Sequence, residues 1–268
     1  MNPSDLQVEI RARSPGETVA LAARMVQHRP GPFLGAWLFY AAGTFAVGYV
    51  LVGVLGLHWG WMAGLVPLLA PVFALPMVTT VGHLIFSPKV SFGTVALTTL
   101  RRGPAFLVLF FVNRVMTLAG LAFFVVPGLY LWRSSWFLAP IVALEGSSMG
   151  ASFRRGRRFA TGFNAHVASH ALNASLLLAY LTVSFASLGH FLAVKVFGQT
   201  FTVLAELPNN AEVYYPYLCL AGFALAAPYV TLVWFFVYLD VRIRKEGWDL
   251  EIAFRTRAAK MMEQSRGV

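Results

Sequence analysis

The sequence predicts an all-α protein that crosses a membrane six times, as three helical hairpins. Its composition is the first reason. Of the 268 residues, 58% are hydrophobic and only 12% are charged, whereas soluble domains carry about 25% charged residues. A soluble fold could not cover so much apolar surface, but a bilayer removes the need to cover it. The second reason is the pattern along the chain, in which apolar runs alternate with basic segments.

The chain divides into a cytoplasmic N-terminal segment, a membrane domain and a basic cytoplasmic tail. These parts are residues 1–32, 33–239 and 240–268. In the first part, Ser14-Pro15-Gly16-Glu17 forms a capping box with proline at the first helical position, which predicts a short surface helix. The six expected spans are residues 33–57, 62–86, 105–126, 129–144, 164–187 and 216–239.

Each pair of spans is preceded by a short amphipathic segment that we expect to lie on the cytoplasmic surface. The second such helix is predicted between an N-cap at Ser91 and a stop at Gly103, and the third from Ser147 or Ser148 to Arg158. The threefold arrangement suggests an internal repeat, although any segment leading into a membrane from the cytoplasm has this character. Three prolines, Pro67, Pro71 and Pro76, predict a kinked second span.

The distribution of lysine and arginine predicts the topology. Of the 21 cations, 18 fall in four segments: the N-terminal part, residues 89–102, residues 154–158 and the tail. Six crossings place all four segments in the cytoplasm, with both termini inside. A seventh crossing at residues 189–206 would move the tail outside, so we interpret that stretch as an outer-surface or re-entrant helix. The net charge of +10 therefore indicates topology and contact with anionic lipid headgroups rather than nucleic-acid binding.

Two arginines lie inside predicted spans and are the candidate ligand-binding residues. Arg114, next to Asn113, falls near the middle of the third span, and Arg133 near the outer end of the fourth. No acid within a predicted span can neutralise Arg114, so it must reach the interface, meet backbone carbonyls or face water. Together the two arginines could form a positive path for an anionic headgroup or solute. The alternative is a purely structural role.

Acids at the cytoplasmic ends of two spans are expected to form structural salt bridges. Glu145 ends the fourth span and Asp240 follows the sixth. We expect these salt bridges to lock two hairpins together, and a docking site for a partner protein is the functional alternative. The expected basic partners are Arg154 and Arg155 for Glu145, and Arg242 and Arg244 for Asp240.

Two histidines, His166 and His170, stand four residues apart on one face of the fifth span. Imidazoles at this spacing can share a metal ion, but a site requires at least one further ligand. His83 is the other histidine that the predicted topology places near this depth. Hydrogen bonding between helices is the commoner role for such residues, so the sequence predicts no metal site and no cofactor.

Two stretches resemble a known family. Residues 139–146 (APIVALEG), followed by the arginine-rich segment and Thr161-Gly162, are similar to the central signature of bacterial proteins with a glycerophosphodiester phosphodiesterase membrane domain. Residues 238–251 (YLDVRIRKEGWDLE) resemble the charged segment that closes the last span in the same group, and the similarity covers roughly residues 90–252. The resemblance implies a stand-alone six-span protein of the bacterial cytoplasmic membrane and does not imply a reaction. Arg154 departs from the pattern, because many relatives have a small residue there.

The sequence favours a protein without catalytic activity. No nucleophile–base pair or metal cluster is evident, and few acids lie away from the chain ends. We expect a membrane scaffold or envelope-associated component whose partners are lipids and either another membrane protein or further copies of itself. The alternative is a transporter or lipid-handling protein that uses Arg114 and Arg133.

Overall fold

The computed structural model describes residues 13–87, 90–146, 148–160, 164–196 and 211–247, and all the elements in these ranges are helical. Five helical segments are long and apolar enough to cross a membrane: Pro30–Val54, Trp59–Ile85, Phe92–Phe123, Ala165–Val196 and Tyr215–Glu246. The structure therefore shows an all-helical, multi-pass membrane protein. It does not confirm six spans, because the predicted fourth span is not one continuous helix.

The N-terminal surface helix forms where the capping box predicts it. α1 (Pro15–His28) begins after Ser14, whose hydroxyl accepts from the backbone N–H of Glu17, while the Glu17 carboxylate accepts from the backbone N–H of Ser14. α2 (Pro30–Tyr49) follows almost directly and ends in a π-helical turn, η2 (Val50–Val54).

The second apolar segment is not a regular helix throughout, in agreement with the predicted kink: a 3₁₀ turn that contains Pro71 interrupts it. α3 (Trp59–Leu69) leads into a 3₁₀ turn, η3 (Ala70–Phe73), and then into α4 (Ala74–Phe86). Each proline lacks an N–H donor, so the regular helical hydrogen-bond ladder cannot run through this region unbroken.

The stop predicted at Gly103 is wrong. α5 (Phe92–Phe123) begins at the predicted cap, Ser91, but continues through Gly103 and Pro104 as a single helix of 32 residues, about 48 Å long. Glycine permits a helix to end but does not force it to. In apolar surroundings each backbone group needs an internal partner, which favours continuing the helix. The second surface helix and the third span are thus one element.

The predicted fourth span consists of three short pieces: α6 (Val125–Ser134), a 3₁₀ turn, η4 (Ser135–Phe137), and α7 (Leu138–Glu145). α6 starts directly after Phe124, so the α5–α6 turn comes before residue 126, the predicted end of the third span. α7 ends at Gly146, whose φ of +58° suits a residue without a side chain.

The last part of the chain contains α8 (Met149–Ala160), α9 (Asn164–Phe191) with a π-helical extension η5 (Leu192–Val196), and α11 (Ala211–Glu246). The boundary predicted at residue 240 falls inside α11, because the helix continues unbroken past Asp240. Residues 189–196 continue α9 rather than starting a separate helix. The rest of the segment predicted to be re-entrant, residues 197–206, lies outside the described residues, as does most of the basic tail.

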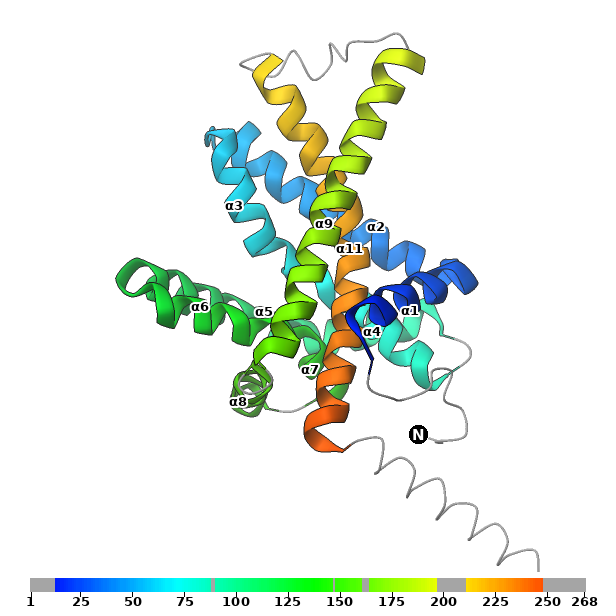
Figure 1. The fold of residues 1–268 in the computed structure, drawn as a ribbon, viewed down its shortest axis with the longest axis vertical. Coiled ribbons are helices and arrows are strands. Elements are labelled where there is room, and N and C mark those ends of the chain that lie inside the picture. Colours follow the sequence, from blue (N-terminus) through cyan, green and yellow to red (C-terminus); the bar gives the residue numbers. More distant parts are fainter. Residues whose placement is uncertain (1–12, 88–89, 147, 161–163, 197–210, 248–268) are drawn as a thin grey trace, which may run out of the picture.

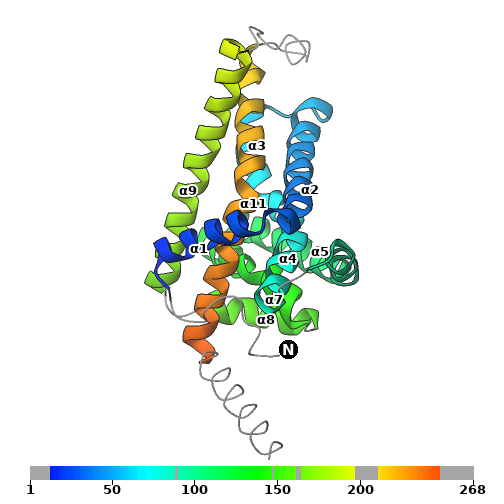
Figure 2. The same ribbon diagram turned by 90° about the vertical axis from the view of Figure 1, so that its right-hand side faces the viewer.

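The helices lie in two directions (Figures 1 and 2). α9 and α11 pack along the long axis of the molecule, and α2 and α3 occupy the same upper half. The α5–α6 hairpin extends sideways: it lies across the view in Figure 1, and α5 is seen end-on in Figure 2. α8 also runs across the long axis, below the hairpin. α5 is therefore not parallel to α9 and α11, although it is as apolar as they are.

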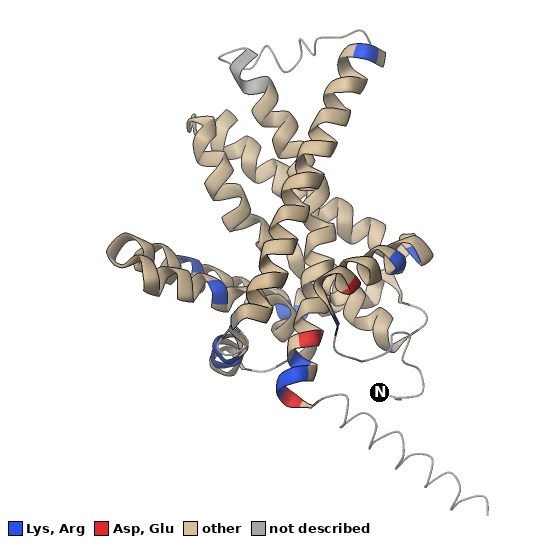
Figure 3. Ribbon diagram, viewed as in Figure 1, with Lys and Arg blue, Asp and Glu red and all other residues tan. Residues whose placement is uncertain are grey.

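The main core lies where α4, α7 and α11 meet, and large apolar side chains such as Phe137, Ile141 and Phe235 are buried there. Charged residues gather around the lower half of the molecule (Figure 3). Among the described cations, only Lys195, in η5 at the far end of α9, stands apart from the elements of that half. Within the described residues, one end of the structure is thus strongly basic and the other carries little charge.

Candidate functional site

Asn113 and Arg114 on α5 are buried and hold the break between α6 and α7. The Asn113 amide lies 3.3 Å from the carbonyl oxygen of Leu131 and 3.4 Å from the hydroxyl of Ser134. Arg114 donates from Nη1 to the hydroxyl of Ser135 at 3.1 Å. Both side chains therefore bind the helix end and the 3₁₀ turn that follow them in the chain.

The surroundings of Arg114 are closed and aromatic. Its guanidinium carbon lies 4.8 Å from the centre of the Phe110 ring, and the residue is only 5% exposed. The adjoining cavity, of about 100 Å³, is lined mainly by apolar residues including Trp136 and Trp234. Ligand pockets for small molecules commonly measure about 300–1,000 Å³. In this conformation the space beside Arg114 cannot hold a lipid headgroup.

Arg133, the other candidate ligand-binding residue, has a different set of described contacts from Arg114. It lies near the end of α6, within electrostatic range of Lys245 at the end of α11. Two of its guanidinium nitrogens, Nε and Nη2, are buried without a hydrogen-bond partner among the described residues. α8 packs against α6 here, and its Arg157 lies over the ring of Tyr130, 5.6 Å from the ring centre.

Glu145 belongs to a network that joins α7, α8 and α11. Nε of Arg155 lies 2.6 Å from Oε2 of Glu145, and Nη2 of the same arginine lies 2.6 Å from Oε1 of Glu246. The hydroxyl of Tyr238 donates to Glu145 at 2.7 Å, and Arg242 pairs with Glu246 rather than with Asp240. One arginine on α8 thus bridges acids on two other helices. Arg154 is exposed, and no ion pair links it to a described acid.

Asp240 is 1% exposed and accepts hydrogen bonds from two parts of the chain. Its Oδ1 lies 2.7 Å from the backbone nitrogen of Arg13, which precedes α1. Arg244, one turn further along α11, reaches Oδ1 and Oδ2 at 3.2 and 3.0 Å. The carboxylate therefore fixes the start of the described chain against the end of α11.

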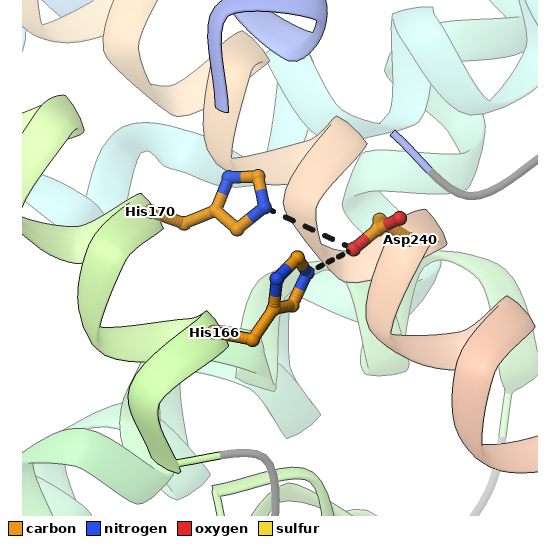
Figure 4. Close-up of side chains that lie close together, drawn as sticks. All are labelled: His166, His170 and Asp240. Carbon is orange, nitrogen blue, oxygen red and sulfur yellow. Dashed lines mark hydrogen bonds and ion pairs between the residues drawn. The ribbon is translucent and has the colours of Figure 1, made fainter. Parts of the chain in front are cut away.

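The two histidines of α9 face the same carboxylate (Figure 4). Nε2 of His166 lies 2.5 Å from Oδ2 of Asp240, and Nε2 of His170 lies 3.9 Å from that oxygen. The three ligand atoms all lie within 4.8 Å of one another. His170 is 2% exposed, and its Nε2 makes no hydrogen bond within the described residues. Two imidazoles and one carboxylate form a set of ligands that first-row transition metals accept.

Several of these contacts are not evident from the sequence. Glu246 shares Arg155 with Glu145, and Asp240 binds His166 as well as its expected arginine, Arg244. Arg102 donates to the carbonyl oxygens of Val142 and Ala143, which lie at the open end of α7. A positive side chain near the last turn of a helix is a general signal, but the sequence gives no sign that α7 ends beside α5.

The fold defines the class of the protein, an all-helical and multi-pass membrane protein with one basic end. Comparisons with family models, with curated proteins and with solved structures find no match to this chain. The resemblance to the glycerophosphodiester phosphodiesterase membrane domain therefore stays a prediction.

Proposed function

We propose that the protein is a membrane scaffold without catalytic activity, which holds anionic phospholipid headgroups at its basic end. The observation that carries the proposal is a group of cations, which we call the basic cluster, at the junction of α6, α8 and α11. Its members are Arg133, Arg157, Arg158 and Lys245.

The basic cluster brings four cations together among the described residues. Arg133 keeps two buried nitrogens without hydrogen-bond partners in the described residues. Arg158 and Arg133 both act electrostatically on Lys245, and the ammonium group of Lys245 donates to the backbone carbonyls of Arg158 and Phe159. Unlike Arg155, Arg133 forms no ion pair with a described acid. A phosphate oxygen of a lipid headgroup supplies the acceptor that Arg133 lacks.

The orientation that follows places the basic end at the cytoplasmic leaflet, because cations accumulate on that side. In this orientation the α5–α6 hairpin lies along the leaflet, since it runs across the long axis (Figures 1 and 2). Apolar side chains such as Phe111, Val115 and Phe123 are exposed on it. A surface of this kind is stable when immersed at the boundary between headgroups and acyl chains. The hairpin then anchors the protein in one leaflet.

The closed surroundings of Arg114 support a scaffold over a transport path. Arg114 binds Ser135 and stacks on Phe110 beside a cavity of about 100 Å³. The Ser135 hydroxyl accepts a hydrogen bond from the guanidinium group, and the Phe110 ring attracts its positive charge. Arg114 therefore stabilises the break between α6 and α7. The cytoplasmic network around Arg155 further joins three helices that a transport cycle would need to separate.

The test is lipid retention in native mass spectrometry. The protein is extracted from nanodiscs that contain equal amounts of phosphatidylglycerol and phosphatidylcholine. We expect the wild-type chain to retain phosphatidylglycerol preferentially and Arg133→Gln to retain about fivefold less, because one basic contact at a membrane surface contributes about 1 kcal/mol. Arg101→Gln, at an exposed arginine on α5, is the matched control. Equal retention of the two lipids by the wild type would overturn the proposal.

A second candidate, a lipid-handling protein, is favoured by an apolar groove of about 620 Å³ between α2, α4 and the first turns of α5. Phe39, Val95 and Leu100 line it, and Phe92 at its rim is 79% exposed. Its size and chemistry suit one acyl chain. Ala96→Phe, which narrows the groove, should lower the exchange of a spin-labelled lipid if the groove holds a lipid in transit. Unchanged exchange would leave the scaffold as the better description.

A further inference from the structure

The three side chains in Figure 4 come from two helices that are far apart in the chain. His166 and His170 occupy successive turns of α9 and point toward α11, where Asp240 faces them. The imidazole ring centres lie 4.6 Å apart with their planes at 81°. Both Nε2 atoms, rather than one Nε2 and one Nδ1, lie on the side of the carboxylate. The two helices therefore bring three ligand atoms to one point.

Hydrogen bonding leaves this cluster incomplete. A neutral His166 can donate its Nε2 proton to Oδ2 of Asp240 across the 2.5 Å between them. The second imidazole has no such bond, because Nε2 of His170 lies 3.9 Å from the same oxygen and has no hydrogen-bond partner in the described chain. Leaving a buried polar nitrogen without a partner costs about 1–3 kcal/mol. The cluster is thus poorly explained as a network of hydrogen bonds alone.

The dimensions are close to those of a tetrahedral metal site. Zinc binds imidazole nitrogen and carboxylate oxygen at about 2.0–2.2 Å, which separates neighbouring ligand atoms by about 3.3–3.5 Å. The two separations to Oδ2, 2.5 and 3.9 Å, lie on either side of that value, and the ligand nitrogens of the two histidines lie within 4.8 Å of each other. Entry of an ion therefore requires side-chain shifts of about 1 Å, which histidine and aspartate achieve by small rotations.

Hydrogen bonds to the Asp240 carboxylate hold it in place, as hydrogen bonds to metal-binding carboxylates usually do. Oδ1 of Asp240 accepts the backbone N–H of Arg13 and lies 3.2 Å from Nε of Arg244. These contacts fix the plane of the carboxylate and leave Oδ2 directed at the histidines, although Arg244 also reaches Oδ2 at 3.0 Å. Hydrogen bonds of this type to a ligating carboxylate are typical of the surroundings of protein metal sites.

We propose that His166, His170 and Asp240 bind one divalent first-row transition-metal ion, with zinc as the best match, and that water completes the coordination. The ion satisfies Nε2 of His170 and joins α9 to α11. Through the contact of Asp240 with Arg13, it also fastens the chain that precedes α1. The site is separate from the basic cluster and does not depend on the proposed lipid binding.

The test is metal content. The full chain is purified on a tag without histidine, stripped with a chelator, incubated with Zn²⁺ and dialysed, and zinc is measured by mass spectrometry. We expect one zinc ion per chain in the wild type and a loss of at least tenfold in His170→Gln. His28→Gln, which changes an exposed histidine outside the cluster, should match the wild type. A wild-type chain without stoichiometric zinc, or a His170→Gln chain that keeps it, would overturn the proposal.

Two further measurements separate metal binding from folding. His170 is buried, so His170→Gln is compared with and without zinc rather than with the wild type: zinc should raise the unfolding temperatures of the wild type and of His28→Gln and leave that of His170→Gln unchanged. Co²⁺ added to the unmodified chain should produce the visible absorption bands of a tetrahedral site. This readout needs no variant. An octahedral cobalt spectrum identical to that of free Co²⁺ would contradict the site.

Discussion

The α9–α11 pair and the α5–α6 hairpin differ in direction, although α5, α9 and α11 all meet the same criteria of length and hydropathy for a membrane span. α11 is the central helix, with 61% of its most apolar window buried, whereas only 6% of the α9 window and 33% of the α5 window are buried. The pair runs along the long axis and the hairpin across it (Figures 1 and 2). Hydropathy thus identifies a helix that suits lipid but not the direction in which it lies.

Local contacts account for the difference. In the pair, Gly222 of α11 sits so close to α9 that an added Cβ would lie 2.4 Å from the carbonyl oxygen of Thr182. In the hairpin, a Cβ on Gly128 of α6 would lie 2.4 Å from the backbone nitrogen of Leu121, so the two helices turn back on each other tightly. The hairpin is then held to α7 by Arg102 and to η4 by Arg114. Small residues permit each close approach.

The largest effect is expected from Asp240→Ala, which removes a buried carboxylate at the basic end of the α9–α11 pair. Removing the carboxylate leaves Arg244, the Arg13 backbone N–H and His166 without their common acceptor. Breaking a buried pair of this kind costs about 3–5 kcal/mol. Unfolding in a denaturing detergent measures it, with Arg154→Ala as the control at an exposed position. A change below about 1 kcal/mol would show that the network does not hold the pair.

The second largest effect is expected from Gly222→Ala. It should lower the free energy of unfolding by about 1–3 kcal/mol, because backbone atoms of α9 must move to accept the methyl group. Gly64→Ala, on α3, is the matched control, since its added Cβ meets nothing within 4 Å. Thermal unfolding of the detergent-solubilised proteins compares the two. Equal stability of both variants would mean that the α9–α11 contact is looser than the structure shows.

Gly128→Ala distinguishes the two regions, because it should destabilise the α5–α6 hairpin without affecting the α9–α11 pair. Its methyl group collides with α5 at Leu121, at a cost of about 1–3 kcal/mol that falls on the α5–α6 turn. Hydrogen exchange should increase in α6 and the last turns of α5 while α9 and α11 stay protected. If protection falls equally everywhere, the two regions form one cooperative unit.

The smallest effect is expected from Arg155→Gln, which breaks the bridge between α7 and α11 through α8. The arginine side chain is 28% exposed, so water can solvate the two glutamates when their ion pairs with Arg155 are removed. We therefore expect the free energy of unfolding to fall by about 1 kcal/mol. High salt should reduce the wild-type stability toward that of the variant. A variant that is less stable by several kcal/mol would show that the Arg155 bridge stabilises the protein as much as the Asp240 network does.

The sequence predicts those parts of the fold that depend on neighbouring residues. The capping box at Ser14, the N-cap at Ser91 and the broken helix at Pro67–Pro76 all form, because each follows from chemistry within a few positions. The stop at Gly103 does not form, since glycine allows a helix to continue and the apolar surroundings favour it. The sequence also does not predict the direction of α5, because that direction depends on contacts with α6 and α7.

The candidate site follows the same division. The spacing of His166 and His170 indicates a shared face, and Asp240 with Arg244 are one turn apart, so both pairs are readable from α-helical periodicity. Their meeting depends on the register between α9 and α11, which are separated by residues 197–210. Arg114 contacts Ser135, whereas Arg133 on α6 lies within electrostatic range of Lys245 on α11, and neither contact is evident from the sequence. Distances along a chain do not determine which helices become neighbours.

The most direct test of the two-direction arrangement is the depth of α5 in a bilayer. Spin labels are placed one at a time at Leu107, Phe111, Val115 and Leu118, which are all exposed, in a Cys219→Ser background. Collision rates with oxygen and with a water-soluble nickel chelate give each depth. A hairpin along the leaflet predicts that all four labels lie at about 5–10 Å below the headgroups. A steady change in depth of about 16 Å from position 107 to position 118 would show that α5 crosses the membrane and would contradict this arrangement.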